Sequence, residues 1–270
     1  MPPLAPPFIY IFTFVMGTIF GSFLNVCIAR IPEEESVVQP RSHCPQCKTF
    51  IAWYDNIPLF SFMLLGGQCR KCKGPISGFY PLIEALTGFL ALLCVWKFQF
   101  SLQAALWFLS FICPLVVISF IDLKHFLIPD IITLPFTILG MLVHMAFFHS
   151  QPFLQRGLDS LFGIFLGAGS LWIVAKLYEF FKKQEGLGLG DVKLMAMLGA
   201  FLGARSILFI FLFSSFLASI LSIFLMIFAK YRLKSALPYG PFLALGGLLH
   251  LFFGSEILRA YFHWIHSILH

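Results

Sequence analysis

The sequence predicts an all-α polytopic membrane protein with about eight transmembrane helices. Of its 270 residues, 59% are hydrophobic, 11% are charged and 35 are Phe, which is more apolar surface than one soluble core of this size buries. Apolar runs of about 20 residues, the length that crosses a bilayer as a helix, recur from end to end. The alternating ten-residue pattern of a barrel strand does not occur, so the spans are expected to be helical.

The first apolar run, residues 8–29, has no basic segment before it and no small-residue cleavage site followed by a soluble domain. It is therefore predicted to be a retained span and not a signal peptide. Seven further runs follow, of which the sixth span in the chain is short. They are expected near residues 80–96, 102–121, 128–148, 157–181, 191–204, 206–229 and 239–258.

The distribution of Lys and Arg predicts the orientation of these spans, because basic loops are retained on the cytoplasmic side. Most of these residues lie in the loops at the ends of odd-numbered spans. The opposite loops hold only Lys97, Arg156, Arg205 and Arg259. Both termini are therefore expected to face away from the cytoplasm. The net charge of +6 is attributed to topology and to contact with membrane lipid. No nucleic-acid partner is expected, since no basic face interleaved with stacking aromatic residues occurs outside the spans.

One loop, residues 30–80, is long enough to form a small domain between the first two spans. About 50 residues are too few for stability from hydrophobic burial alone. The loop contains an internal repeat, CPQCKTFI at 44–51 and CRKCKGPI at 69–76. Two Cys-x-x-Cys pairs offer four thiolates to one tetrahedral ion, as in a zinc ribbon. A structural zinc is therefore predicted on Cys44, Cys47, Cys69 and Cys72.

Two disulfides or a redox pair are the alternative for these cysteines. A reducing cytoplasmic location disfavours disulfides, and neither pair opens a helix in a strand–helix–strand unit. With all four positions filled by protein, no site is left for a water, so the metal is expected to stabilise the fold and not to catalyse. The other three cysteines, Cys27, Cys94 and Cys113, lie in apolar runs and are interpreted as small buried hydrophobic residues.

The stretch EGLGLGDVKL, residues 185–194, has three glycines before an aspartate. A phosphate-binding glycine loop follows a strand, but here a membrane span precedes the glycines, so a nucleotide site is disfavoured. The glycines are therefore interpreted as a flexible or close-packed turn that places Asp191 at the start of the sixth span. A carboxylate at that depth is costly unless it serves a function.

Asp122 ends the third span on the side of the membrane where the sixth begins, so it is expected at the same level as Asp191. Two carboxylates that share a proton can activate a water and protonate a leaving amine. Taken singly, each could instead be an interfacial or helix-capping residue. Asp130, directly after Pro129, is the second choice and looks more like a cap. The positive end of a helix dipole is expected to make Asp191 the base, with Asp122 as the protonated acid.

Several motifs in order resemble the bacterial type IV prepilin peptidases: GSFLNVCIARIP, the two cysteine pairs, YPLIEALTG, IDLKHFLIPD, GLGDVKL and LPYGPFLALG. The resemblance is nearly end to end. It implies an intramembrane aspartyl protease with Asp122 and Asp191 as catalytic residues and the four cysteines as metal ligands. It also implies that prepilins and pseudopilins lose a short leader at the cytoplasmic face of the bacterial inner membrane, and that S-adenosylmethionine then methylates the new N-terminus.

The resemblance implies a first transmembrane helix (1–29), a cytoplasmic four-cysteine zinc-binding domain that is also expected to carry the methyltransferase part (30–80), and a transmembrane aspartyl peptidase core (81–270). No Rossmann pattern locates the methyl donor. Gly66 and Gly67 are candidates for contacting it, although a turn entering the second cysteine pair explains them equally well. The non-enzyme alternative is an ion-coupled transporter. A zinc metalloprotease is disfavoured because no His-Glu-x-x-His sequence occurs.

Overall fold

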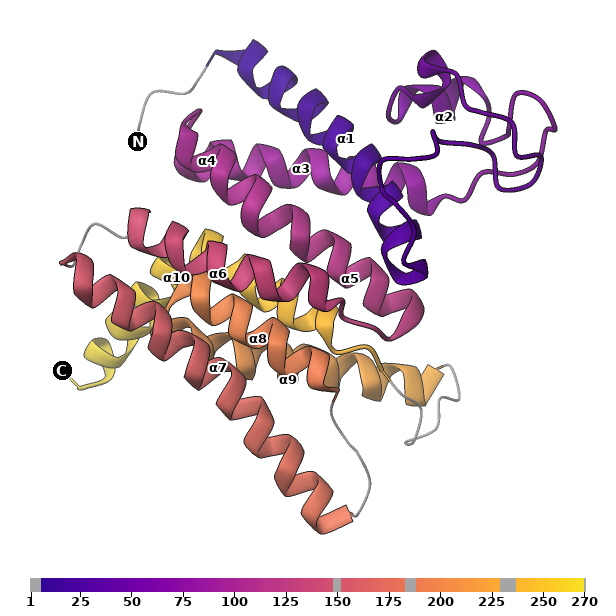
Figure 1. Cartoon of the computed structure of the whole chain (residues 1–270). Coiled ribbons are helices and arrows are strands. Elements are labelled where there is room, and N and C mark those ends of the chain that lie inside the picture. The colour runs from indigo at the N-terminus through magenta and orange to yellow at the C-terminus, as the bar shows by residue number, and fades with distance from the viewer. Residues whose placement is uncertain (1–5, 148–151, 183–187, 229–236, 270) are drawn as a thin grey trace. The chain divides into compact units, whose positions relative to one another are not determined.

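The computed structural model describes residues 6–147, 152–182, 188–228 and 237–269. Within these ranges every regular element is a helix, and extended pairing is limited to two isolated bridges, His43 with Phe50 and Gln68 with Pro75. The predicted all-α class is therefore confirmed (Figure 1). The chain forms two compact units, Met1–Ile121 and Asp122–His270. The predicted boundaries at residues 29 and 80 separate functional roles and not compact units, and they stay a prediction.

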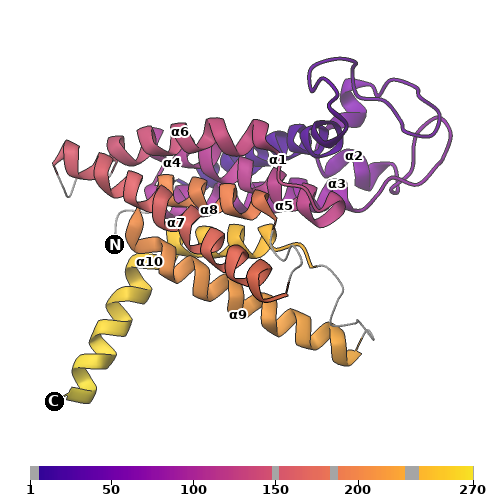
Figure 2. The ribbon, with the colours of Figure 1, turned by 60° about the horizontal axis from the view of Figure 1, so that its bottom comes forward.

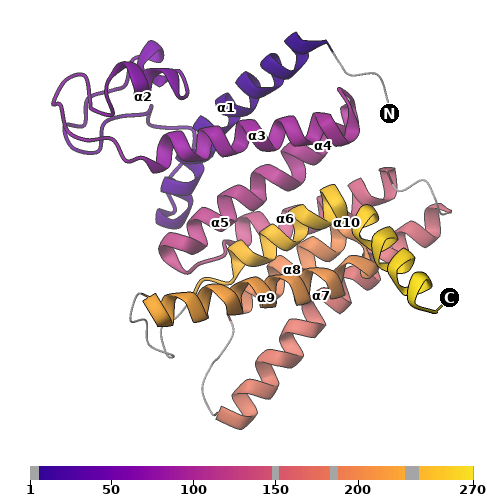
Figure 3. The same ribbon diagram turned by 180° about the vertical axis from the view of Figure 1, so that it is seen from behind.

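The first unit begins with α1 (Pro7–Arg30), which packs along α3 (Phe79–Phe98), as Figure 3 shows from behind. Small residues allow the two helices to approach closely: a Cβ added at Gly17 would lie 2.8 Å from the Cα of Gly88. Such small-residue seams are typical of helix packing in membranes, where the backbones gain contact area. The remaining elements of this part are η1 (Ile31–Glu33), η2 (Trp53–Asn56), α2 (Phe60–Leu64), α4 (Leu102–Trp107), the π-turn η3 (Phe108–Ile112) and α5 (Cys113–His125), whose last turn belongs to the second unit.

The second unit is a bundle in which α8 (Leu189–Leu202) is the central helix. It packs against all the others: α6 (Asp130–Phe147), α7 (Phe153–Lys182), α9 (Ala204–Phe228) and α10 (Gly240–Leu269). Six of its side chains are fully buried: Leu194, Met195, Met197, Leu198, Ala200 and Phe201. After α8 the chain reverses at Gly203, where φ is 78°, and returns as α9 (Figure 2).

Seven helical segments of the described residues are long and apolar enough to cross a membrane. The remaining expected span, the short sixth one at 191–204, corresponds to α8, whose 14 residues extend about 21 Å at 1.5 Å per residue. That length is shorter than a hydrocarbon core of about 30 Å. Because α8 is enclosed by four longer helices, its polar first turn does not have to reach the bilayer surface through lipid. The short central helix is what positions Asp191.

Candidate active site and metal centre

Asp122 lies in the last turn of α5 and is 5% exposed. Its Oδ2 accepts a hydrogen bond of 2.9 Å from the backbone amide of Gly240, the first residue of α10. The first amides of a helix have no partner within the helix, so this carboxylate satisfies one of them. A Cβ at position 240 would lie 2.7 Å from the same oxygen. The absence of a side chain at Gly240 therefore permits the contact.

Tyr239 fixes the beginning of α10 to α9. Its hydroxyl lies 2.9 Å from Ser214 Oγ and 3.0 Å from Ser215 Oγ. The three oxygens form a small polar network beside Gly240, and networks of this kind hold backbone positions more firmly than single contacts do. The sequence reasoning assigned no role to Tyr239 or Gly240. The Tyr-Gly-Pro sequence at 239–241 was the available signal, because it places a residue without a Cβ at a helix start.

Asp191 is the third residue of α8, and its backbone amide donates to the carbonyl of Gly188. Its carboxylate is near enough to that of Asp122 for the two charges to repel each other. The two aspartates that the sequence paired thus come together in the second unit. The first residues of the 185–194 stretch, 185–187, lie outside the described part of the chain.

Gly190, directly before Asp191, allows close packing against a neighbouring side chain. A Cβ at Gly190 would lie 2.8 Å from the Cβ of Ile128, and one at Gly240 would lie 3.2 Å from Ile128 Cδ1. Ile128 is therefore buried between the starts of α8 and α10, and it keeps the two aspartates at a fixed separation. Of the two sequence-based options for this turn, these contacts favour the close-packed one.

Asp130 has a different environment from the pair. It begins α6 and its side chain is 54% exposed, with both carboxylate oxygens 2.7 Å from Nζ of Lys193. An exposed ion pair of this kind contributes about 0.2–1 kcal/mol. The contact links the first turns of α6 and α8 and leaves Asp130 engaged with a cation, in keeping with its position as the second choice.

The geometry of Asp122 affects how a proton can be shared. Because Oδ2 already accepts the amide hydrogen of Gly240, Oδ1 is the more favourable oxygen for a proton on Asp122. Asp122 also lies at the amino end of α10, just as Asp191 lies at that of α8. The positive end of a helix dipole therefore acts on both residues. It does not by itself distinguish the base from the acid.

The four cysteines Cys44, Cys47, Cys69 and Cys72 form one cluster, with all four sulfurs within 4.8 Å of one another. The sulfurs of Cys44 and Cys72, from different pairs, are 3.9 Å apart. Tetrahedral zinc at a Zn–S distance of about 2.3 Å separates its sulfurs by about 3.8 Å. The thiols are free in the structure, so the donor set and its spacing fit a metal ion, and the cysteine cluster is confirmed as a possible metal site.

The internal repeat is also a structural repeat. The amide of Lys48 donates to the carbonyl of Cys44 and the amide of Lys73 to that of Cys69, both at 2.9 Å. Both lysines have left-handed backbone conformations, with φ of 56° and 57°. The two loops thus present their sulfurs in the same way.

Local hydrogen bonds favour the thiolate form at two of the four sulfurs, those of Cys47 and Cys69. The hydroxyl of Thr49, followed by its amide, lowers the pKa of the Cys47 thiol to about 6. The amides of Cys72 and Lys71 lower the pKa of Cys69. Metal ligation requires thiolates, so these contacts favour binding.

Gly66 and Gly67 form the turn that precedes the second cysteine pair. Both have positive φ, 59° and 69°. The carbonyl of Gly67 accepts from the amide of Ile76, and a Cβ at Gly67 would lie 3.1 Å from the ring of Phe62. Backbone conformation and packing therefore explain both glycines, and their contact with a methyl donor stays a prediction.

Glu84 is a buried carboxylate that the sequence reasoning missed. It lies in α3, is 8% exposed, and accepts a 2.8 Å hydrogen bond from the amide of Leu59. Leu59 has a φ of 60°, which is unfavourable for a residue with a branched side chain. The contact holds the loop before α2 against the transmembrane helices, and the only sequence signal was an acidic residue inside an apolar run.

Two family models match the chain. Residues 15–98 match the bacterial peptidase A24 N-terminal domain, and residues 109–223 match the type IV leader peptidase family. No solved structure matches the chain.

Curated relatives cover nearly the whole chain. The prepilin leader peptidase/N-methyltransferase of Pseudomonas aeruginosa is 36% identical over 92% of this chain and 92% of its own length. The protein of the same name from Xanthomonas campestris pv. campestris is 37% identical over 91% and 92%, and that from Myxococcus xanthus is 40% identical over 84% and 66%. Together with two aspartates that meet at the starts of two helices, these matches show that the chain belongs to the type IV leader peptidase family.

Proposed function

We propose that this protein cleaves the leader peptides of prepilins and pseudopilins with Asp122 and Asp191, and then methylates the new N-terminus. The observation that carries the proposal is the meeting of these two carboxylates at the starts of α8 and α10. A transporter that binds ions at carboxylates does not account for the four-cysteine cluster, and the relatives named above are leader peptidases. Peptide hydrolysis by an aspartate pair accounts for the geometry directly.

In the proposed reaction Asp191 removes a proton from a water held between the carboxylates. The resulting hydroxide attacks the scissile carbonyl carbon, while a proton on Oδ1 of Asp122 stabilises the developing oxyanion. Collapse of the tetrahedral intermediate breaks the C–N bond, and the leaving amine takes a proton from the pair. Gly240 holds Oδ2 of Asp122 throughout, so that the side chain does not rotate away from the substrate.

The metal site is proposed to hold zinc in a structural role. Cys44, Cys47, Cys69 and Cys72 would be its ligands, and they would keep residues 30–80 folded. S-adenosylmethionine supplies a methyl group on a sulfonium sulfur. The new N-terminal amine would attack the carbon of that methyl group, the C–S bond would break with S-adenosylhomocysteine as the leaving thioether, and the amine would release one proton. We place donor binding in residues 30–80, with Gly66 and Gly67 as candidate contacts.

The proposed location is the bacterial inner membrane, with the aspartate pair on the cytoplasmic side and both termini in the periplasm. The distribution of Lys and Arg between the loops supports this orientation. Some of the residues that carry the charge argument, Lys183, Lys230, Arg232 and Lys234, lie outside the described residues.

Mass spectrometry of a reaction product tests both activities at once. The purified protein is incubated with a prepilin and labelled S-adenosylmethionine, and the product is weighed. Loss of the leader mass and gain of one labelled methyl group are separate changes. An uncleaved substrate would contradict the peptidase assignment, whereas cleavage without labelling would contradict only the methyltransferase assignment.

A further inference from the structure

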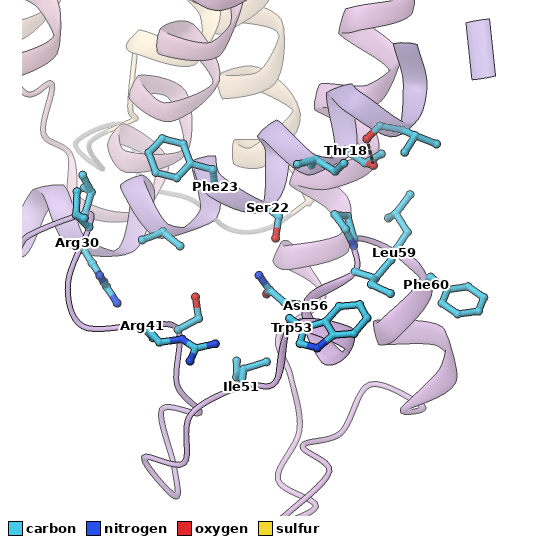
Figure 4. A pocket seen from close by; sticks show the side chains of 18 of the residues that line it. Thr18, Ser22, Phe23, Arg30, Arg41, Ile51, Trp53, Asn56, Leu59 and Phe60 are labelled. Atoms are coloured by element: carbon cyan, nitrogen blue, oxygen red, sulfur yellow. Dashed lines mark hydrogen bonds between the residues drawn. The ribbon is translucent and has the colours of Figure 1, made fainter. Parts of the chain in front are cut away.

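A cavity of about 830 Å³ lies in the first unit between α1 and the segment 37–63 (Figure 4). Its size is in the range of ligand-binding pockets, about 300–1,000 Å³. One wall is a side of α1 from Phe14 to Arg30, and the other comes from the loop that contains η2 and α2. Ser22 of α1 and Asn56 of η2 point toward one another across it.

Along α1 the cavity is apolar and open. Val15, Ile19 and Phe23 are 47%, 48% and 50% exposed, and on the opposite wall Phe60 and Met63 are 52% and 69% exposed. Val15, Ile19 and Phe23 belong to a helix that is long and apolar enough to cross a membrane. Exposed apolar surface of this extent beside such a helix is suited to contact with acyl chains.

The other end of the cavity is cationic. Arg30, the last residue of α1, and Arg41 both line it, and none of the lining residues is Asp or Glu. Arg30 donates to the carbonyls of Ser36 and Pro40 at 2.9 and 2.8 Å, so its position is fixed while its charge is not neutralised. Arg41 is exposed and has no ion pair among the described residues.

Trp53 also lines this cavity, and its ring is 76% exposed. Figure 4 shows the Arg41 side chain extending toward it. Tryptophan is enriched where hydrocarbon meets headgroups, because its ring is apolar and its N–H is polar. Two arginines and a tryptophan in the lining of an apolar groove therefore resemble the interface layer of a membrane.

We propose that this cavity binds one anionic phospholipid, with its phosphate beside Arg41 and Arg30 and an acyl chain along α1. Charge complementarity selects this ligand. The methyl donor carries sulfonium and ammonium cations, for which the lining offers no carboxylate. A basic leader peptide would be repelled by both arginines. A bound lipid would join α1 to the cysteine-containing segment, and the proposal does not depend on the peptidase or methyltransferase activity.

Quenching of Trp53 fluorescence by brominated lipids tests the site. The full-length protein is placed in phosphatidylcholine nanodiscs that contain increasing fractions of either tail-brominated phosphatidylglycerol or tail-brominated phosphatidylcholine. The difference between the wild type and Trp53→Phe isolates the signal of Trp53 from the other tryptophans. We expect half-maximal quenching at a fraction of phosphatidylglycerol that is at least about fivefold lower, the factor expected for one arginine near the headgroups.

Arg41→Gln should remove most of this preference, and Arg41→Lys should keep it. Arg205→Gln, at an exposed arginine outside the cavity, is the matched control and should behave as the wild type. Equal half-quenching by the two lipids in the wild type would overturn the proposal, even if the variants fail to fold. Relief of quenching by excess inorganic phosphate would also overturn it, because the site would then take a free anion and not a lipid.

Discussion

Gly240 is the residue on which the geometry of Asp122 depends most directly. A methyl group at this position would meet Oδ2 at 2.7 Å, so Gly240→Ala should displace the carboxylate or the start of α10. Because small misplacements of catalytic groups are costly, we expect cleavage to fall by about a hundredfold. The measurement is the rate of leader removal at equal amounts of membrane-inserted protein.

Gly78→Ala is the matched control for this change. Gly78 precedes α3, and a Cβ there would meet nothing within 4 Å. Its activity should equal that of the wild type. Normal cleavage by the Gly240→Ala protein would show that the amide contact to Asp122 is dispensable.

The two proposed catalytic aspartates should respond differently to amide substitution. Asp122→Asn retains an oxygen for the amide of Gly240 and an N–H that can polarise a carbonyl, whereas Asp191→Asn removes the proposed base. We expect both variants to be severely impaired, with higher residual cleavage for Asp122→Asn across the pH range. The opposite order would reverse the two roles.

Asp130→Asn is the internal control, since it changes an exposed carboxylate of the same unit that is paired with Lys193. It should cost at most about 1 kcal/mol of stability and should leave cleavage intact. Loss of cleavage in this variant alone would identify Asp130 as a partner in the chemistry.

At the scale of elements, the hydroxyl of Tyr239 links the start of α10 to α9 through two hydrogen bonds. Tyr239→Phe removes the contacts to Ser214 and Ser215 and leaves the ring in place. We expect a loss of about 1 kcal/mol of stability and a lower rate of cleavage with unchanged substrate affinity. Tyr178→Phe on the exposed surface of α7 should change neither quantity. An unaltered rate for Tyr239→Phe would mean that α10 is positioned by packing alone.

The packing of α7 on α8 depends on glycines that meet face to face. A Cβ at Gly163 of α7 would collide with the backbone carbonyl of Gly199. Gly163→Ala should therefore lower stability by about 1–3 kcal/mol through overpacking. Gly169→Ala on the same helix meets nothing within 4 Å and should be neutral. Thermal unfolding in detergent compares the two, and equal melting temperatures would contradict close packing at Gly163.

At the scale of the whole molecule, the metal site and the aspartate pair belong to different units. We expect one zinc per chain by elemental analysis, bound by four cysteines. Cleavage should resist moderate chelation, because in the proposed role the metal would stabilise residues 30–80 and take no part in hydrolysis. Cys47→Ser should lower zinc content and methylation more than cleavage. A disulfide within either cysteine pair in native membranes, or immediate loss of cleavage on chelation, would contradict this model.

Local patterns in the sequence determined the fold class, the cysteine cluster and the choice of the two aspartates. Apolar runs specify helices because a span satisfies its own backbone hydrogen bonds. Each cysteine repeat specifies the conformation of its own loop, because the hydrogen bond that closes the loop joins residues only a few positions apart. Asp122 and Asp191 could be paired because the number of spans between them predicts that both lie on the same side of the membrane.

Only the tertiary structure decided what holds these groups. The amide of Gly240 reaches Asp122 across 118 residues, Glu84 reaches Leu59 across 25, and α8 is too short to span yet is buried by its neighbours. Contacts between distant segments depend on how helices pack, and no local periodicity encodes them. The sequence therefore indicated Asp122 and Asp191 as the candidate reacting groups. Packing supplied the backbone donor, the close-fitting glycines and the buried Ile128 that surround them.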